Sequence, residues 1–424
     1  MLKQIRDQLK ELNITNYLLR EERKNSVELF FIRRRLDMRR IKDVSVVYAT
    51  VYRDFDSDGT AMRGSSAVVL SPDMSAEEQR EALLGAYAAA ENVRNPMYEL
   101  YQGEADPDMR KCGIAGEPLT AVARTMTEAL FSADADPEAF LNSAELFVER
   151  STVRIVSSSG TDVSYEKTGC NGEFVAQCKE PRDVEQHSIF SYESADADAL
   201  RSKVAKALET VRDRAHAEKA PVAGTYDLIL SGEHIAELLS YYLARANAQM
   251  VFAHYSDYRP GTAVQGDAVT GERLNLTVLP DAPWSGEGVP MPERALITDG
   301  VLKFLHGPVR FCRYLGTEPT GDYDRIRLDN GTIPFDSLKR GCLWPVSFSD
   351  FQMDDFSGHF GGEIRLAYLF TEDGVEILTG GSVNGSLIEK QGELTFSTER
   401  FSSASYEGPF AVRIPGVRVA GKDS

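Results

Sequence analysis

The spacing of apolar positions changes along the first seventy residues of the chain. Apolar residues recur every three or four positions over residues 1–12, which predicts a short amphipathic helix. The period then falls to two, because residues 26–32 and 43–52 are rich in β-branched and aromatic side chains. After a turn at residues 56–59, the apolar run 66–70 continues the pattern. We therefore expect paired strands that form a first sheet.

Helical spacing returns at four further places in the first half. The clearest start is Ser75, because Glu78 three residues later completes a capping box. The stretch 95–118 is loop-like. The predicted helices cover residues 75–93, 120–131, 137–149 and 199–217.

Turn signals separate the remaining apolar runs and predict hairpins. A Ser-Ser-Ser-Gly turn at residues 157–160 lies between runs 152–156 and 162–165. In the second half, Asp299-Gly300 and Asp373-Gly374 each separate two apolar runs. We expect an α+β protein with two domains. Residues 1–220 would form an N-terminal α/β-layered domain with a mixed sheet and helices, and residues 221–424 a C-terminal β-rich domain of mainly antiparallel strands.

Composition narrows the class of protein. The 424 residues are 42% apolar, enough for ordinary cores, yet no apolar run has the length of a membrane span. Residues 1–12 do not resemble a signal peptide, so we expect a cytoplasmic protein without membrane contact. The five cysteines are scattered and odd in number, which argues against a disulfide framework and predicts reduced thiols. The formal charge of −18 disfavours binding to nucleic acid.

One basic cluster departs from this acidic balance. Five arginines lie within the sequence FFIRRRLDMRR, where Asp37 interrupts the run. The cluster lacks the aromatic interleaving of a single-strand nucleic-acid platform. A solvated strand or an edge protected by charge is favoured over a ligand patch. The arginines are Arg33, Arg34, Arg35, Arg39 and Arg40.

Candidate chemistry is concentrated in residues 226–250, an apolar strand followed by a Ser-Gly turn and a helix. His234 and Glu237 form a lone i, i+3 pair, and Leu238 stands where an inverted H-x-x-E-H motif would place its second histidine. A lone histidine near a helix start is more often a cap or a partly exposed polar residue than a ligand. His359 and the other histidines are far apart in the chain, so convergence in space is open.

Several short stretches, in this order, resemble the TldD/PmbA family, whose members were once called modulators of DNA gyrase. Each match is weak alone, and their order over residues 59–385 is the specific part. In the first half they are RGSS at 63–66, LSPD at 70–73 and VRIVSSSG at 153–160. In the second half they are RALI at 294–297, DGVL at 299–302, TG at 320–321, FSGHF at 356–360, DGVE at 373–376 and VNG at 383–385.

The family's catalytic TldD-like members carry H-E-x-x-x-H on the helix after the first strand of the second domain. In this chain SYYLAR, residues 240–245, occupies that place. Ser240 and Arg245 stand where two imidazoles would bind zinc, and Tyr241 replaces the general base. An arginine repels a divalent cation. The five-residue spacing also puts positions 240 and 245 roughly 140° apart on an ideal helix. The late cysteine ligand of the catalytic members has no counterpart after Cys342.

The resemblance implies a PmbA-like member involved in cytosolic peptide proteolysis. It would be a subunit of a metallopeptidase family that lacks its own zinc motif, with zinc present only at a partner's site. A dimer is expected, either a homodimer or a heterodimer with an H-E-x-x-x-H paralogue. A non-catalytic homodimeric peptide-binding protein is the alternative. A peptidase that uses His234, Glu237 or His359 in an unconventional arrangement is the least favoured reading, so whether the chain is itself an enzyme stays open.

Overall fold

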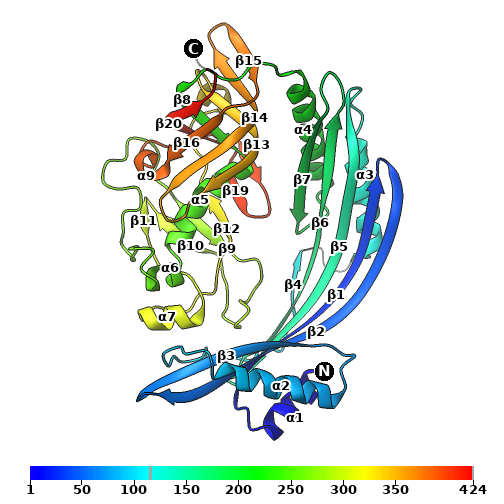
Figure 1. Cartoon of the computed structure of the whole chain (residues 1–424), viewed down its shortest axis with the longest axis vertical. Helices are drawn as coiled ribbons and strands as arrows, with labels where there is room; N and C mark the ends of the chain where they lie inside the picture. The colour runs from blue at the N-terminus through cyan, green and yellow to red at the C-terminus, as the bar shows by residue number, and fades with distance from the viewer. Residues whose placement is uncertain (114–116, 423–424) are drawn as a thin grey trace.

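The structure is a computed structural model that describes residues 1–113 and 117–422. Figure 1 shows a long curved sheet that carries the N-terminal helices and, beside it, a strand-rich body formed by the second half of the chain. Helices make up 22% of the chain and strands 45%. The α+β fold class with a strand-rich second half is confirmed.

The first half of the chain builds one mixed sheet in the order β3-β2-β1-β5-β6-β4, with β7 beside β6. All neighbours are antiparallel except β4, which runs parallel to β6. The strands are β1 (Asn16–Ile32), β2 (Arg35–Ser57), β3 (Thr60–Leu70), β4 (Arg110–Gly113), β5 (Ala139–Ser157), β6 (Asp162–Cys178) and β7 (Val184–Tyr192). The predicted pairing of residues 26–32 with 43–52 belongs to a longer hairpin, β1 and β2.

Two pairs of helices cover this sheet at different heights (Figure 1). Helices α1 (Leu2–Glu11) and α2 (Ala76–Ala90) share one core with the lower part of the sheet. Helices α3 (Leu119–Ser132) and α4 (Ala197–His216) share another with its upper part. The capping box at the start of α2 is confirmed: Ser75 and Glu78 exchange their two hydrogen bonds.

The helix predicted over residues 137–149 is wrong, because this segment is the first part of β5. The buried positions Ala139 and Leu141 alternate as in a strand, and so do the later ones from Ala144. A register shift between Leu141 and Ser143 inserts one extra residue. The resulting spacing of three between Leu141 and Ala144 imitates helical periodicity. Within the predicted loop 95–118, residues 114–116 lie outside the described residues, and residues 110–113 form β4.

The second half forms two sheets, ordered β11-β10-β9-β12-β19-β18 and β13-β8-β20-β16-β14-β15, and β17 pairs with β20. Both hairpins predicted at Asp299-Gly300 and Asp373-Gly374 are confirmed. The strands are β8 (Gly224–Ser231), β9 (Leu276–Leu279), β10 (Arg294–Thr298), β11 (Val301–Leu302), β12 (Arg325–Leu328), β13 (Leu343–Met353), β14 (His359–Thr371), β15 (Gly374–Leu378), β16 (Ser382–Ser386), β17 (Thr395–Phe396), β18 (Arg400–Ser402), β19 (Tyr406–Pro409) and β20 (Ala411–Ala420). The helices are α5 (Glu233–Arg245), α6 (Ala248–Phe252), α7 (Val309–Leu315), α8 (Phe335–Leu338) and α9 (Leu387–Lys390).

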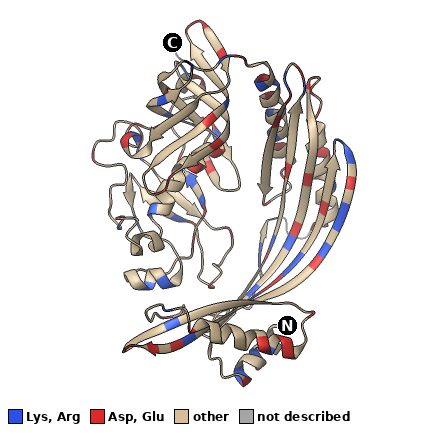
Figure 2. Cartoon of the chain, in the orientation of Figure 1, with Lys and Arg blue, Asp and Glu red and all other residues tan. Residues whose placement is uncertain are grey.

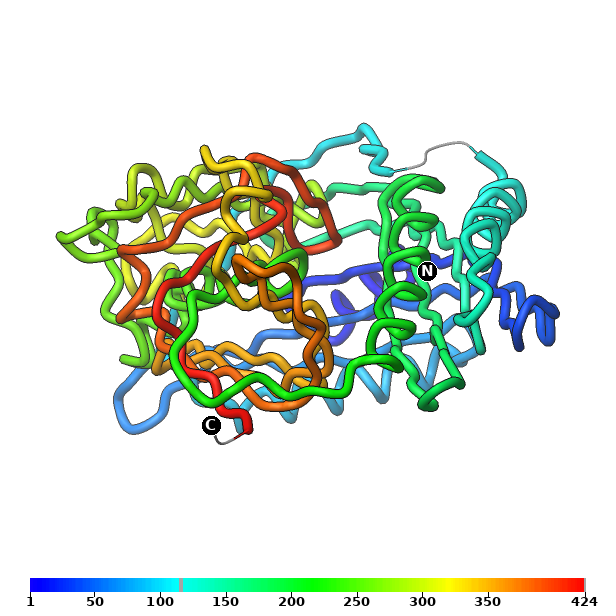
Figure 3. Tube along the Cα trace, turned by 90° about the horizontal axis from the view of Figure 1, so that it is seen from above, coloured from blue at the N-terminus to red at the C-terminus, as the bar shows by residue number. Residues whose placement is uncertain are grey.

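Seen from above, the second half lies on the left and helices α3 and α4 on the right (Figure 3). A loop of the second half nevertheless reaches the N-terminal sheet. Trp284 packs with Tyr165 at a ring-centroid distance of 6.4 Å, in a small core that includes Val153, Ile155 and Val163. Buried apolar contact of this kind stabilises one arrangement of the two halves.

The arginine cluster of residues 33–40 lies at the turn between β1 and β2 and along the first part of β2, as the strand interpretation expects. Its charges are largely paired. Arg34 contacts Asp134 at 3.1 Å, while Arg40 and Lys42 both reach the buried Glu28. In the part of the chain that the structure describes, no helix is long and apolar enough to cross a membrane.

Candidate functional site

The segment that carries the resembled motif begins with β8, which lies between β20 and β13 in the sheet. The chain turns at Gly232, whose φ of 60° is a left-handed conformation that favours glycine. Helix α5 then runs without interruption from Glu233 to Arg245. The motif positions Ser240, Tyr241 and Arg245 therefore occupy the second half of a regular helix.

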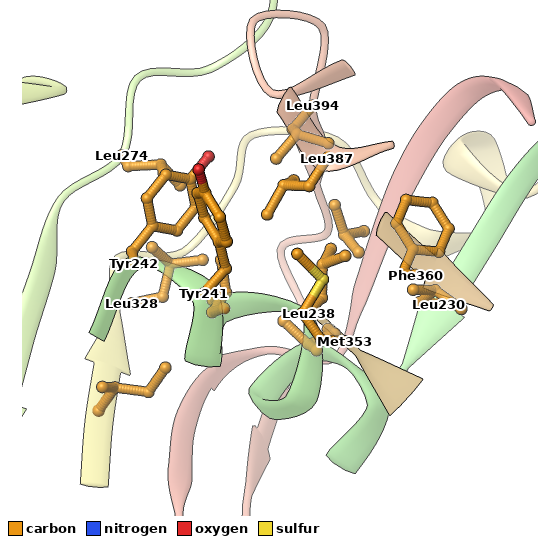
Figure 4. Packing of buried hydrophobic residues seen from close by; sticks show 14 of the residues in the cluster. Leu230, Leu238, Tyr241, Tyr242, Leu274, Leu328, Met353, Phe360, Leu387 and Leu394 are labelled. Carbon is orange, nitrogen blue, oxygen red and sulfur yellow. The ribbon is translucent and has the colours of Figure 1, made fainter. Parts of the chain in front are cut away.

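The inner face of α5 packs into the largest core of the second half. Tyr242 and Leu238 have no exposed surface, and Tyr241 is 4% exposed. Figure 4 shows their side chains among those of Leu274, Met353 and Leu387. Burial raises the pKa of the Tyr241 hydroxyl, so this side chain stays protonated near neutral pH and cannot act as the general base.

Ser240 connects α5 to the turn between β13 and β14. Its hydroxyl lies 3.1 Å from a carboxylate oxygen of Asp355 and 2.8 Å from the Glu237 carbonyl. Burial raises the pKa of Asp355, and the contact with Ser240 opposes that shift. The Glu237 carboxylate accepts a hydrogen bond from the Met353 amide at 3.3 Å. Ser240 and Glu237 thus hold α5 against the end of β13 and the turn that follows it.

Arg245 ends the helix and is tied to the loop that follows α6. Its guanidinium donates to the Tyr255 carbonyl and to the Asp257 carboxylate. The same group lies over the rings of Tyr258 and Tyr241, 5.3 and 5.9 Å from their centroids. Only 13% of the Arg245 side chain is exposed. A fixed cation therefore stands at the position of the second zinc-binding histidine in the resembled motif.

A surface hollow of about 740 Å³ opens beside Arg245. Its lining combines apolar, aromatic and polar side chains. The lining residues are Arg245, Val251, His254–Pro260, Leu305, Leu315 and Thr317.

The other predicted site residues lie apart from Ser240 and Arg245. His234 packs edge-on against Phe348 and Phe351, at ring distances of 4.9 and 5.4 Å, and burial lowers its pKa. His359 is exposed at the start of β14 and lines a separate open groove of about 710 Å³. Among residues 1–113 and 117–422, no three histidine, cysteine or acidic side chains are grouped to hold a metal ion. The donor set at 240–245 does not fit zinc.

Sequence reasoning missed the residues that contact the motif positions from elsewhere. Asp355, Tyr255 and Asp257 each lie in loops with no periodicity to reveal them. His306 is 2% exposed, and its Nε2 lies 2.9 Å from the Leu243 carbonyl. Because a carbonyl only accepts, Nε2 carries the proton and holds the end of α5 in place.

A second cavity, of about 430 Å³, lies between the two halves. Ion pairs cross it: Lys167 of β6 contacts Asp281, and Arg325 of β12 contacts Glu193 at 3.0 Å. Arg325 is also within 3.4 Å of Glu407. The contacts of Lys167 with Asp281 and of Arg325 with Glu193 join β6 and the end of β7 to the second half, and each links residues more than a hundred positions apart in the chain.

Comparison with protein-family models finds two matches. Residues 114–216 match the PmbA/TldA metallopeptidase central domain, and residues 223–421 match the PmbA/TldA metallopeptidase C-terminal domain. A search of curated proteins finds no significant match.

Solved structures share the fold at low sequence identity. A candidate modulator of a DNA gyrase from Thermotoga maritima has a TM-score of 0.78 at 15% identity, over 99% of this chain and 100% of that one. TldE from Thermococcus kodakarensis has a TM-score of 0.74 at 16% identity, over 99% and 100%. A candidate modulator of DNA gyrase from Bacteroides thetaiotaomicron has a TM-score of 0.75 at 16% identity, over 99% of both chains.

Proposed function

The chain belongs to the PmbA/TldD family, and on that premise we propose that it is a PmbA-like subunit that lacks a zinc site of its own. It acts in cytosolic peptide proteolysis, where it completes or gates the active site of a zinc-containing partner. It is thus metallopeptidase-related without being a complete metallopeptidase.

The observation that carries this proposal is the anchored guanidinium of Arg245. Zinc is held by thiolate, imidazole or carboxylate ligands, and a positive charge at a ligand position repels the ion. Arg245 contacts Asp257 and the Tyr255 carbonyl and is largely buried, so its charge cannot swing away freely. At the other ligand position, the hydroxyl of Ser240 is already hydrogen-bonded to the Asp355 carboxylate.

The hollow beside Arg245 supports a role in handling peptides. Tyr255, which is 58% exposed, gives it aromatic surface, and polar side chains such as His254 and Thr317 give it hydrogen-bonding capacity. A peptide needs both, because its side chains vary and its backbone does not.

Affinity purification of the tagged chain from its native host tests this function. Recovery of an H-E-x-x-x-H paralogue in equal amount, and peptide cleavage by the pair but by neither subunit alone, are the expected results. Recovery of the chain alone, together with cleavage by that chain alone, would contradict the proposal.

The second candidate is a homodimeric protein that binds extended peptides without cutting them. The cavity between the halves favours it, because none of residues 240–245 lines that space and polar groups of both halves do. Self-association without a paralogue, with peptide binding and no cleavage, would select this candidate.

An active peptidase built on His234, Glu237 or His359 requires these residues to act on one bond. His234 packs against two phenylalanine rings and Glu237 accepts a hydrogen bond from the Met353 amide, so both face neighbouring protein groups. If purified chain cleaved peptides and His359→Ala abolished that cleavage, this reading would replace the other two.

A further inference from the structure

The cavity of about 430 Å³ between the two halves has a floor from one half and a roof from the other. The floor is one face of the N-terminal sheet, where lining residues on neighbouring strands lie directly opposite each other. These pairs are Glu149 with Gly169, Ser151 with Lys167 and Asn171 with Ser191. The roof consists of Asp281, Arg325 and residues 402–404 of the β18–β19 hairpin. A cavity of this size holds a small organic molecule.

Gly169 leaves the middle of the floor open. A Cβ built at this position would meet the Tyr192 carbonyl oxygen at 3.1 Å and, among the described residues beyond its chain neighbours, no other heavy atom within 4 Å. Lys167 and Asn171, two positions away on the same strand, line the cavity. A side chain at position 169 would therefore project into the same space, because alternate residues of a strand share one face.

Two buried groups of the roof lack a hydrogen-bond partner. Within residues 1–113 and 117–422, neither the Nε of Arg325 nor the hydroxyl of Ser403 makes a hydrogen bond. The other two guanidinium nitrogens of Arg325 reach Glu193 at 3.0 Å and Glu407 at 3.4 Å. A buried donor without a partner destabilises a protein, and an acceptor bound in the cavity would remove that cost. The roof therefore favours a ligand that carries an acceptor such as a carboxylate.

The lining carries charges of both signs, with acids in excess. Its acids are Glu149, Glu193, Asp196 and Asp281, and its cations are Lys167 and Arg325. Figure 2 shows charged residues of both signs along the strands of this sheet and on the neighbouring part of the second half. Both cations already contact acids, since Lys167 reaches Asp281 and Arg325 reaches Glu193. A ligand that fits this excess of acids brings a positive group of its own.

Two of these acids can accept from such a group. Glu149 contacts Lys24 at 2.7 Å, and one oxygen of Asp196 accepts from the Ala199 amide at 2.9 Å at the start of α4. Each carboxylate keeps further capacity, because its two oxygens together accept several hydrogen bonds. Hydrogen bonds between an ammonium group and a carboxylate are among the stronger ones in proteins.

We propose that this cavity binds a free α-amino acid. The carboxylate of the ligand accepts from Arg325 and Ser403. Its ammonium group donates to Glu149 and Asp196. One ligand then contacts both halves, so its binding favours the arrangement of the halves in this structure. The proposal concerns a small molecule and holds whether or not the chain lacks a zinc site.

Titration of the purified full chain tests the class of ligand. Each standard L-amino acid is added singly at millimolar concentration and detected by saturation-transfer NMR, and calorimetry then measures the tightest binder. The N-acetyl derivative of that amino acid lacks the ammonium group, and its amide lacks the carboxylate. Each derivative should bind about tenfold more weakly or worse, because it loses a charge-assisted hydrogen bond.

Two results of this titration would overturn the proposal. One is that no standard amino acid binds. The other is that a peptide blocked at both ends binds as tightly as the best amino acid, which would favour the second candidate function instead.

Two conservative variants test the contacts inside the cavity. Ser403→Ala removes the roof hydroxyl, and Asp196→Asn removes a negative charge while asparagine still caps α4. Each should raise the dissociation constant of the best amino acid about tenfold. The matched controls are Ser405→Ala in the same hairpin and Asp198→Asn in the first turn of α4. Neither control residue lines the cavity, so neither should change the affinity.

Gly169→Val places a side chain on the floor and should abolish binding. Circular dichroism and thermal melting show whether each variant is folded, and Ser403→Ala should fold because it removes no hydrogen bond of the described chain. Unchanged affinity in both Ser403→Ala and Asp196→Asn would show that the amino acid binds elsewhere and would contradict the proposal. None of these results bears on the proposed function, since no zinc and no cleavage is measured.

Discussion

The two faces of helix α5 make different kinds of contact. The inner face is made of Ile235, Leu238, Leu239, Tyr241 and Tyr242, all buried in the core of the second half. The outer face presents Ser240 and Arg245, each bound to a different loop. In this chain the inner face of α5 stabilises the core, whereas the chemistry of the motif position depends on the outer face. Substitutions on the outer face can therefore change that chemistry while the helix keeps its place in the core.

The largest effect should come from the inner face. Leu239→Ala removes a side chain with no exposed surface and leaves a cavity that the core fills only partly. We expect a loss of about 2–5 kcal/mol in the free energy of unfolding, measured by urea denaturation. Leu84→Ala is the matched control, because Leu84 is 44% exposed on helix α2. If Leu239→Ala lowered the free energy of unfolding no more than its control does, the inner face of α5 would contribute no more to stability than an exposed position.

A smaller effect is expected at the end of the outer face. Arg245→Ala leaves Asp257 and the Tyr255 carbonyl without their partner and should lower stability by about 1.5–3 kcal/mol, the range for hydrogen bonds to charged groups. Hydrogen exchange at residues 254–258 should become faster. Arg259→Ala, at an exposed arginine of the same hollow, should change neither quantity. Equal effects from both variants would mean that Arg245 is not an anchor.

His234, in the first turn of α5, should make the stability of the chain depend on pH. Burial holds the pKa of His234 below its unfolded value of about 6.5, so the unfolded chain binds the proton more readily. The contribution of His234 to stability is complete above pH 6.5 and declines as the pH falls below it, by at most about 1.4 kcal/mol per pH unit. His234→Gln should reduce this slope between pH 6.5 and 5. An unchanged slope would assign the acid sensitivity to other groups, such as the buried His306, whose pKa is also lowered.

The smallest effect is expected at Ser240. Ser240→Ala removes one hydrogen bond to Asp355 and should lower stability by about 0.5–1.5 kcal/mol. Because that bond opposes the effect of burial, its loss should raise the pKa of the Asp355 carboxyl, which a carbon-13 NMR titration detects. A lower pKa in the variant would show that Ser240 does not stabilise the charged carboxylate.

Local elements were predictable where one physical signal dominates. The capping box at Ser75, the Asp-Gly hairpins and the long apolar face of α4 are examples, because each depends on neighbours within a few residues. The helix expected over 137–149 failed since a single bulge near Asn142 changed the apparent period of a strand. The full length of β1 and β2 was also missed, because their charged residues are balanced by cross-strand pairs such as Glu28 with Lys42.

The site was predictable only in part. The sequence predicted that Ser240, Tyr241 and Arg245 lie on a helix that follows an apolar strand, and they lie on α5. It could not show that Asp355 and Asp257 would contact them, because such contacts depend on loops more than ten and more than a hundred positions away. The cavity between the halves was missed for the same reason, since its ion pairs join β6 and β7 to distant loops and strands.

The central claim is that the motif position of α5 holds no zinc, and metal analysis of the purified chain tests it most directly. The chain should be isolated without chelators, equilibrated with excess zinc, passed through a desalting column and measured by mass spectrometry alongside a peptide-cleavage assay. We predict far less than one zinc per chain and no cleavage of unfolded peptides by the chain alone. One tightly held zinc per chain, lost on mutation of Ser240 or Glu237 together with cleavage, would contradict the account.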